Sequence, residues 1–104
     1  MLEIFNQLIY EYQKGMRDMV LYTCSSKFRN EIETLLKKHG LLYKIYALSD
    51  EKINVFFGAE PCIKILENFS SEDLSKLTKE EDFILGIMLG YSREVQYERL
   101  LSAA

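Results

Sequence analysis

The sequence predicts an α+β fold: one helix, then a β-α-β-β unit forming a three-stranded mixed sheet, then three or four C-terminal helices packed on that sheet. Three observations support this prediction. Apolar residues recur at helical spacing at the start, three short β-rich runs follow, and residues after Gly58 show only helical signals. With 104 residues, 48% of them hydrophobic, we expect a single domain over residues 1–104.

The first half of the chain alternates helix-like and strand-like patterns. Residues 19–24 form a short apolar run that predicts a buried strand, and Ser25 or Ser26 can cap the helix after it. Residues 41–48 and 53–57 predict two further strands, which a short polar turn joins as a hairpin. The helix before all three strands presents one apolar stripe, formed by Leu2, Phe5, Leu8, Ile9 and Tyr12.

The connections between these strands predict how they pair. A helix between the first two strands would make them parallel, and the hairpin would make the third strand antiparallel to the second. Both faces of the second strand are apolar and Lys44 carries its only charge, so helices should cover both faces. Strand edges without a charge or a proline invite pairing. We therefore expect a homodimer, formed through a sheet edge or through the C-terminal helices.

The second half of the chain contains several helix starts. Pro61 suits the first turn of one helix, a short helix is expected over residues 71–77, and Ser92 can cap the last helix. Between these lies the clearest start of all, because Thr78 and Glu81 have the spacing of a capping box. These signals predict helices only, with no further strand.

The helix that follows this capping box has an unusual body. Residues 83–89 are apolar nearly all round, which is typical of a buried helix. Gly86 and Gly90 lie four residues apart and therefore on one face. This spacing predicts that another element packs closely against both glycines.

Charge and hydropathy exclude several classes of protein. The net charge of -3 argues against a nucleic-acid-binding protein, which needs a basic patch for the phosphates. No apolar run is long enough to span a bilayer, and the first residues lack the features of a signal peptide. We therefore expect no membrane association and a cytoplasmic location. The two cysteines lack metal-ligand spacing, and their small number agrees with a reducing compartment. No motif predicts a catalytic group, a metal or a cofactor.

A candidate ligand or thiol site lies where the first strand meets the next helix, at Thr23, Cys24, Ser25 and Ser26. A helix N-terminus there could bind an anion or lower the pKa of the Cys24 thiol. Cys62, in the first turn of a later helix, has a similar setting, at the opposite end of the sheet from Cys24. The competing interpretation is that the serines cap a helix and the cysteines are small core residues.

The last predicted helix is a candidate protein-binding surface. Residues 91–99 mix aromatic and arginine side chains with amide and acidic groups, a composition enriched at protein interfaces. Alternatively, its charged residues form ordinary exposed pairs that contribute little. The residues that we expect to contact a partner are Tyr91, Arg93, Gln96, Tyr97 and Arg99.

Several segments together resemble one bacterial family over nearly the whole chain. They are residues 11–15, 20–23, 54–58, 62–63, 80–86 and 88–91, with Arg93. The family is the domain of unknown function number two-thousand-twenty-three. The resemblance implies a compact α+β fold with three strands, a homodimer and no established activity. In the family pattern a cysteine follows the glutamine of the last helix, where this chain has Tyr97, which argues against thiol chemistry at that position.

The resemblance also implies a link to flavodoxins, because members of the family are often encoded beside or joined to them. Together with the residues above, it predicts a non-enzymatic, homodimeric protein-interaction module, with a flavodoxin as a possible partner. The alternative prediction is a small anion-ligand or thiol/redox protein that uses the site at Cys24.

Overall fold

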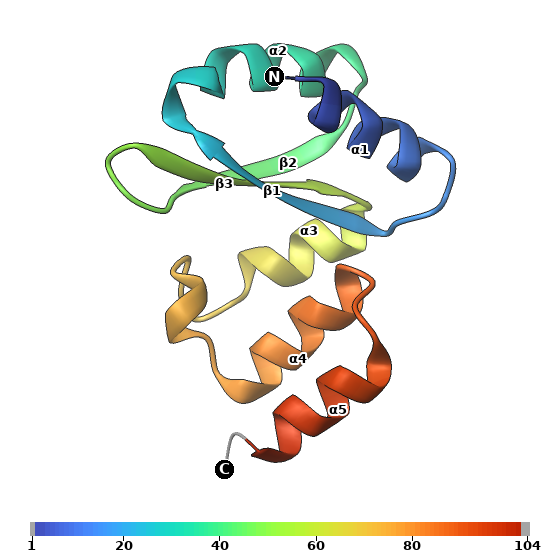
Figure 1. The fold of residues 1–104 in the computed structure, drawn as a ribbon, viewed down its shortest axis with the longest axis vertical. Helices are drawn as coiled ribbons and strands as arrows, with labels where there is room; N and C mark the ends of the chain where they lie inside the picture. Colours follow the sequence, from blue (N-terminus) through green and yellow to red (C-terminus); the bar gives the residue numbers. More distant parts are fainter. Residues whose placement is uncertain (1, 103–104) are drawn as a thin grey trace.

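In the computed structural model, which describes residues 2–102, three strands form one sheet with helices on both of its faces (Figure 1). The α+β class and the order of helix, strands and C-terminal helices are confirmed. The elements are α1 (Glu3–Gln13), β1 (Met19–Ser25), η1 (Ser26–Phe28), α2 (Arg29–Lys38), β2 (Leu42–Ala47), β3 (Lys52–Gly58), α3 (Glu60–Glu67), η2 (Leu74–Lys76), α4 (Lys79–Met88) and α5 (Arg93–Ser102), where η1 and η2 are short 3-10 helices.

The sheet differs from the predicted mixed sheet in its pairing. Its strand order is β1-β3-β2, and β3 is antiparallel to both neighbours. β1 and β2 do run in the same direction, as expected, but β3 lies between them. The central position suits β3 because every residue after Lys52 in this strand is buried, as a strand covered on both faces and both edges should be.

The alternation of side chains along β3 divides the core into two clusters. Val55 and Phe57 point toward α1 and α2, where they pack with Phe5, Ile9 and Leu36. On this side the Phe5 and Phe57 rings meet edge to face, with centroids 5.5 Å apart. The two N-terminal helices thus cover one of the two apolar faces of the sheet.

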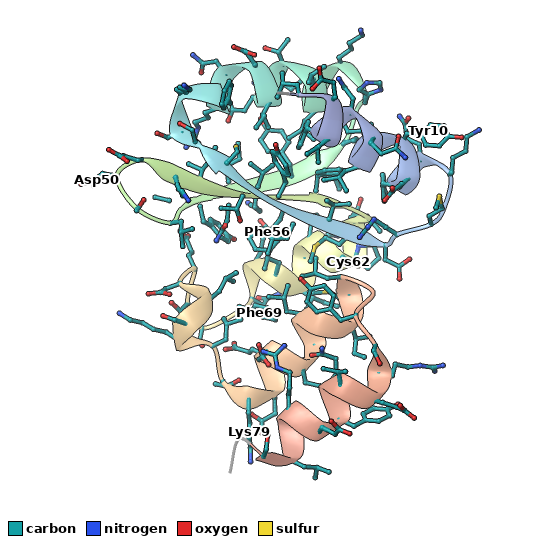
Figure 2. All side chains as sticks on the ribbon, viewed as in Figure 1. Tyr10, Asp50, Phe56, Cys62, Phe69 and Lys79 are labelled. Carbon is teal, nitrogen blue, oxygen red and sulfur yellow. The ribbon has the colours of Figure 1, made fainter. Side chains whose placement is uncertain are left out.

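The second cluster lies on the opposite face, between the sheet and α3 and α4. Phe56 is fully buried there with Ile63, Leu85 and Met88. Figure 2 shows Phe56 pointing from the sheet toward α3, on the same side as Cys62 and Phe69, which also pack against this cluster. The helices α3 and α4 therefore cover the second face, as predicted, whereas α5 adds no residue to this cluster and packs on α4 instead.

The helix boundaries follow the local signals with two exceptions. Thr78 and Glu81 form the predicted capping box, with Thr78 accepting from the Glu81 N–H at 3.1 Å and Glu81 accepting from the Thr78 N–H at 3.0 Å. After β1, however, the chain first forms η1 and α2 begins only at Arg29. The short helix expected over residues 71–77 is reduced to η2.

None of the helices within residues 2–102 has the length and apolar character that a membrane crossing requires.

Candidate functional site

The helices α4 and α5 form an antiparallel hairpin at the C-terminal end of the described chain (Figure 1). Gly90 makes the turn after α4 possible, because it adopts a φ of 81° that favours glycine. Its N–H donates to the Ile87 carbonyl and the next N–H, of Tyr91, donates to the Gly86 carbonyl, both at 3.0 Å. This pair of bonds is a Schellman motif, which ends α4 and turns the chain toward α5.

Gly86, by contrast, is where the two helices touch. A Cβ at this position would overlap the side-chain amide of Gln96 on α5, whereas a Cβ on Gly90 would meet nothing within 4 Å. The predicted close packing is therefore confirmed for Gly86 and wrong for Gly90. The positive φ of Gly90 explains why a glycine is needed there. Sequence spacing alone cannot tell a glycine that ends a helix from one that lets a neighbouring helix approach.

Gln96 is an interior residue, with only 1% of its surface exposed. Its Oε1 is buried against Gly86 and has no hydrogen-bond partner within the described residues. Gln96 was expected to lie on the partner-binding surface, but it is buried between α4 and α5 instead. The side chain points back into the hairpin because Gly86 leaves space for it there.

The other expected partner-binding residues lie on the outside of the hairpin or along its seam. Tyr97 is 49% exposed and stacks on Phe83 of α4, with ring centroids 6.0 Å apart and an interplanar angle of 25°. Arg99 donates to Asp82 of α4 at 2.9 Å. Tyr91 is half exposed, and Arg93 begins α5 as an exposed residue. Tyr97 and Arg99 therefore already use part of their bonding capacity within the chain.

Exposed apolar side chains extend this region beyond the residues predicted from the sequence. Ile87 follows Phe83 by four residues on α4, and Leu101 follows Tyr97 by four on α5, so the Phe83–Tyr97 stack joins the two helices into one apolar strip. We define the α4–α5 surface by its exposed large apolar and aromatic residues, Ile84, Ile87, Tyr91, Tyr97 and Leu101. Val95 is exposed as well, but it lies two positions before Tyr97 and therefore on the other side of α5. The two isoleucines were missed because an all-round apolar helix was taken to be buried on every side.

The candidate thiol site at the end of β1 does not assemble. Cys24 lies within the strand and packs against the cluster under α1 and α2, and α2 begins only at Arg29, after η1. Thr23 points to the opposite face, where its hydroxyl donates to Asn54 Oδ1 at 2.6 Å. Ser25 caps η1 by accepting from the Lys27 N–H at 3.4 Å, and the Ser26 N–H donates to the Glu51 carbonyl. No N-terminus of an α-helix therefore faces the thiol.

Both thiols lack the electrostatic setting of a reactive cysteine. Burial raises the pKa of the Cys24 thiol, and burial together with the negative charge of Asp18 raises the pKa of the Cys62 thiol. A reactive cysteine needs the opposite shift. The two cysteines also pack against different clusters on opposite faces of the sheet. Among residues 2–102, no group of three or more His, Cys, Asp or Glu side chains could hold a metal ion.

An apolar hairpin surface on a small α+β scaffold is the feature that the geometry singles out. The chain belongs to the family described as Protein of unknown function (DUF2023), which matches it over residues 3–103. The resemblance inferred from the sequence is thereby confirmed. No curated protein matches this sequence.

Proposed function

We propose that this protein is a non-enzymatic, homodimeric interaction module of the bacterial cytoplasm, and that it binds another protein through the α4–α5 surface. One observation carries the proposal: within α5, a helix of 10 residues, Gln96 is the only buried residue. Apolar side chains of this helix face outward instead, with Val95 and Tyr97 each 49% exposed and Leu101 79% exposed.

The amount of burial in α5 is small for a helix of this length. Isolated helices shorter than about 12–15 residues are marginal in water, so a helix in a protein depends on packing one face. Among the described helices and strands, α4 is the one with which α5 makes extensive contact. A partner protein that covers Tyr97 and Leu101 would add the missing burial.

The residue types on this surface suit a protein partner. Tyrosine and arginine dominate the energetics of many interfaces, and both are present here, with Tyr91, Tyr97 and Arg93 exposed. The neighbouring isoleucines of α4, Ile84 and Ile87, supply apolar area beside them. We propose a flavodoxin as the partner to test first, on the basis of the resemblance to the family.

Affinity measurements with purified flavodoxin from the same organism test this proposal. Tyr97→Ala removes the aromatic ring on α5, and Ile87→Ala removes apolar area on α4. Each should weaken binding by about tenfold or more, the effect expected of residues near the centre of an interface. Tyr10→Ala is the matched control, because Tyr10 is 51% exposed and lies on α1 (Figure 2).

The outcomes separate the surface from the partner. Equal affinities for the wild type, Tyr97→Ala and Ile87→Ala proteins would show that the α4–α5 surface is the wrong one. If the folded wild-type protein does not bind the flavodoxin at all, a flavodoxin partner is excluded.

A further inference from the structure

We propose that two copies of this chain pair along their β2 strands, in antiparallel orientation, and so join their sheets into one continuous sheet. This inference rests on the homodimer of the proposed function and assigns its interface. The evidence is the free edge of β2, a pairing register in which the strand complements itself, and a groove beside that edge.

The backbone groups on one side of β2 have no partner in the described chain. The Leu48 N–H donates to the Lys52 carbonyl at 2.9 Å, which places the even-numbered residues of β2 in hydrogen-bonded pairs with β3. The N–H and carbonyl groups of Tyr43, Ile45 and Ala47 therefore point away from β3. Within residues 2–102, no turn, cap or loop bonds these outward groups.

An antiparallel pair centred on Ile45 would use all of these free groups. Ile45 would face Ile45 of the second copy, and Tyr43 would face Ala47, as hydrogen-bonded pairs. In the same register Lys44 lies opposite Tyr46 rather than opposite a second lysine, so that like charges do not meet. The strand is thus complementary to itself in this alignment.

The same register brings the most exposed apolar residues of this edge together. Leu42 is 46% exposed and Leu48 is 53% exposed in the single chain. They would lie directly opposite each other as close, non-hydrogen-bonded pairs, and the two-fold symmetry would form this contact twice. Both belong to the face of the sheet that carries α3.

A groove on that face provides space for the incoming side chains. It has a volume of about 340 Å³ and lies between β2 and α3, with Leu42 and Ile63 in its lining. Lys44, the only charge on β2, does not protect the edge, because its Nζ is bound to Glu67 Oε2 of α3 at 2.7 Å. Leu48 of the second copy would project over this groove, beside Leu42.

The other edge of the sheet, β1, is a poorer interface. Met19 and Val20 are already buried in the single chain, and no residue of β1 is an exposed large hydrophobic. Pairing there would remove little apolar surface from water. The apolar residues that gain burial lie on the β2 side.

The proposed pairing has a consequence for partner binding. The two-fold axis of an antiparallel strand pair within one sheet is perpendicular to the sheet, so each face of the sheet stays on its own side. The α3–α5 layers of both copies, with their α4–α5 surfaces, would therefore lie on the same side of the dimer.

A charge-exchange experiment tests the interface and its register by measuring the dimer dissociation constant in sedimentation equilibrium. Leu42→Glu and Leu48→Lys should each raise this constant about tenfold or more, because each change acts twice in a symmetric dimer. The double variant should recover most of the loss, because the register places its opposite charges against each other. Met16→Lys is the control, since Met16 is 67% exposed and lies outside β2.

The possible results distinguish this inference from the proposed homodimer. A wild-type chain that is monomeric at tens of micromolar would overturn both. A dimer that is unaffected by both single changes would leave the homodimer standing and overturn the β2 interface. Two weakened single variants without recovery in the double variant would overturn the register.

Hydrogen exchange of the wild-type protein gives a second test that needs no variant. The amides of Tyr43, Ile45 and Ala47 should become protected as the protein concentration rises through the dimerisation range. The amides of Lys44 and Tyr46, which already bond to β3, should change much less. Concentration-independent exchange at the three outward amides in a dimeric sample would refute the β2 interface.

Discussion

At the scale of single residues, Gly86 and Gln96 control how closely α4 and α5 approach each other. The glycine leaves room for a long amide side chain, and that side chain is buried at 1% exposure. The Gln96 Oε1 lies where a Cβ on residue 86 would be, and it has no hydrogen-bond partner in the described chain. The pair therefore acts as one unit.

We predict that the effect of Gly86→Ala changes sign with the residue at position 96. In the wild-type protein the added methyl group should lower the free energy of unfolding by about 1–3 kcal/mol, the usual cost of overpacking. In a Gln96→Ala background the same change should raise it by about 1 kcal/mol, because alanine favours a helix over glycine. Urea unfolding of the four proteins measures this cycle. Equal effects of Gly86→Ala in both backgrounds would show that the two side chains do not compete for one space.

At the scale of elements, the N-terminus of α4 is held by more than its capping box. The Glu81 carboxylate accepts from the Thr78 N–H and also from the N–H and hydroxyl of Ser70, at 2.7 and 2.6 Å. The hydrogen bond from the Ser70 hydroxyl, followed by those from the Thr78 and Ser70 backbone, lowers the pKa of Glu81. This one side chain thus ties the loop after α3 to the start of α4.

The lowered pKa predicts how acid affects stability. Because the folded state favours ionised Glu81, its contribution is fully present above the unfolded pKa, about 4.3, and is lost as the pH falls through the lower folded pKa. Glu81→Gln should therefore reduce the loss of stability between about pH 5 and pH 3. The free energy of unfolding, measured across this range, checks the prediction.

Glu80→Gln is the matched control, since it removes the same charge from the same turn of α4 without touching the capping box. If both variants showed the same acid dependence, general charge effects at the helix terminus would explain it instead.

At the scale of the whole molecule, stability should fall from the central strand toward the C-terminal helix. β3 is hydrogen-bonded on both sides and contributes to both core clusters, whereas α5 rests on α4 and buries one side chain. Regions with few buried contacts open at lower free energy. In native-state hydrogen exchange we expect the slowest amides around Val55–Phe57 and the fastest helical amides in α5. Protection of α5 equal to that of β3 in the free protein would contradict the proposed docking role of this helix.

Local signals were sufficient for most elements because they depend on residues only a few positions apart. The Thr78–Glu81 capping box, the apolar stripe of α1 and the turn between β2 and β3 all belong to this group. The position of β3 between β1 and β2 could not be predicted in this way. A hairpin of β2 and β3 fits more than one strand order, and the local sequence pattern is the same in each of them. Residues 53–57 were predicted to form a strand paired with its hairpin neighbour, but the sequence did not reveal that a second strand would pair on its other side.

The residues of the candidate surface were predicted only in part, because composition is local but exposure depends on other elements. The mixture of Tyr91, Tyr97 and arginines in the last helix was visible in the sequence, and the structure places both tyrosines half exposed. Gln96 was assigned to the wrong side, because its burial depends on the space above Gly86, a residue in another helix. Ile84 and Ile87 were missed because exposure is decided by what packs against a helix.

The sequence by itself determined the fold class, the order of the elements, the capped start of α4 and the membership in a family. Each of these follows from periodicity, capping residues and short motifs within one stretch of chain. Only the tertiary structure decided the strand order, the burial of Gln96, the separation of the two cysteines onto opposite faces and the free edge of β2. These features arise from contacts between residues far apart in the chain, where the packing of one element decides what remains exposed on another.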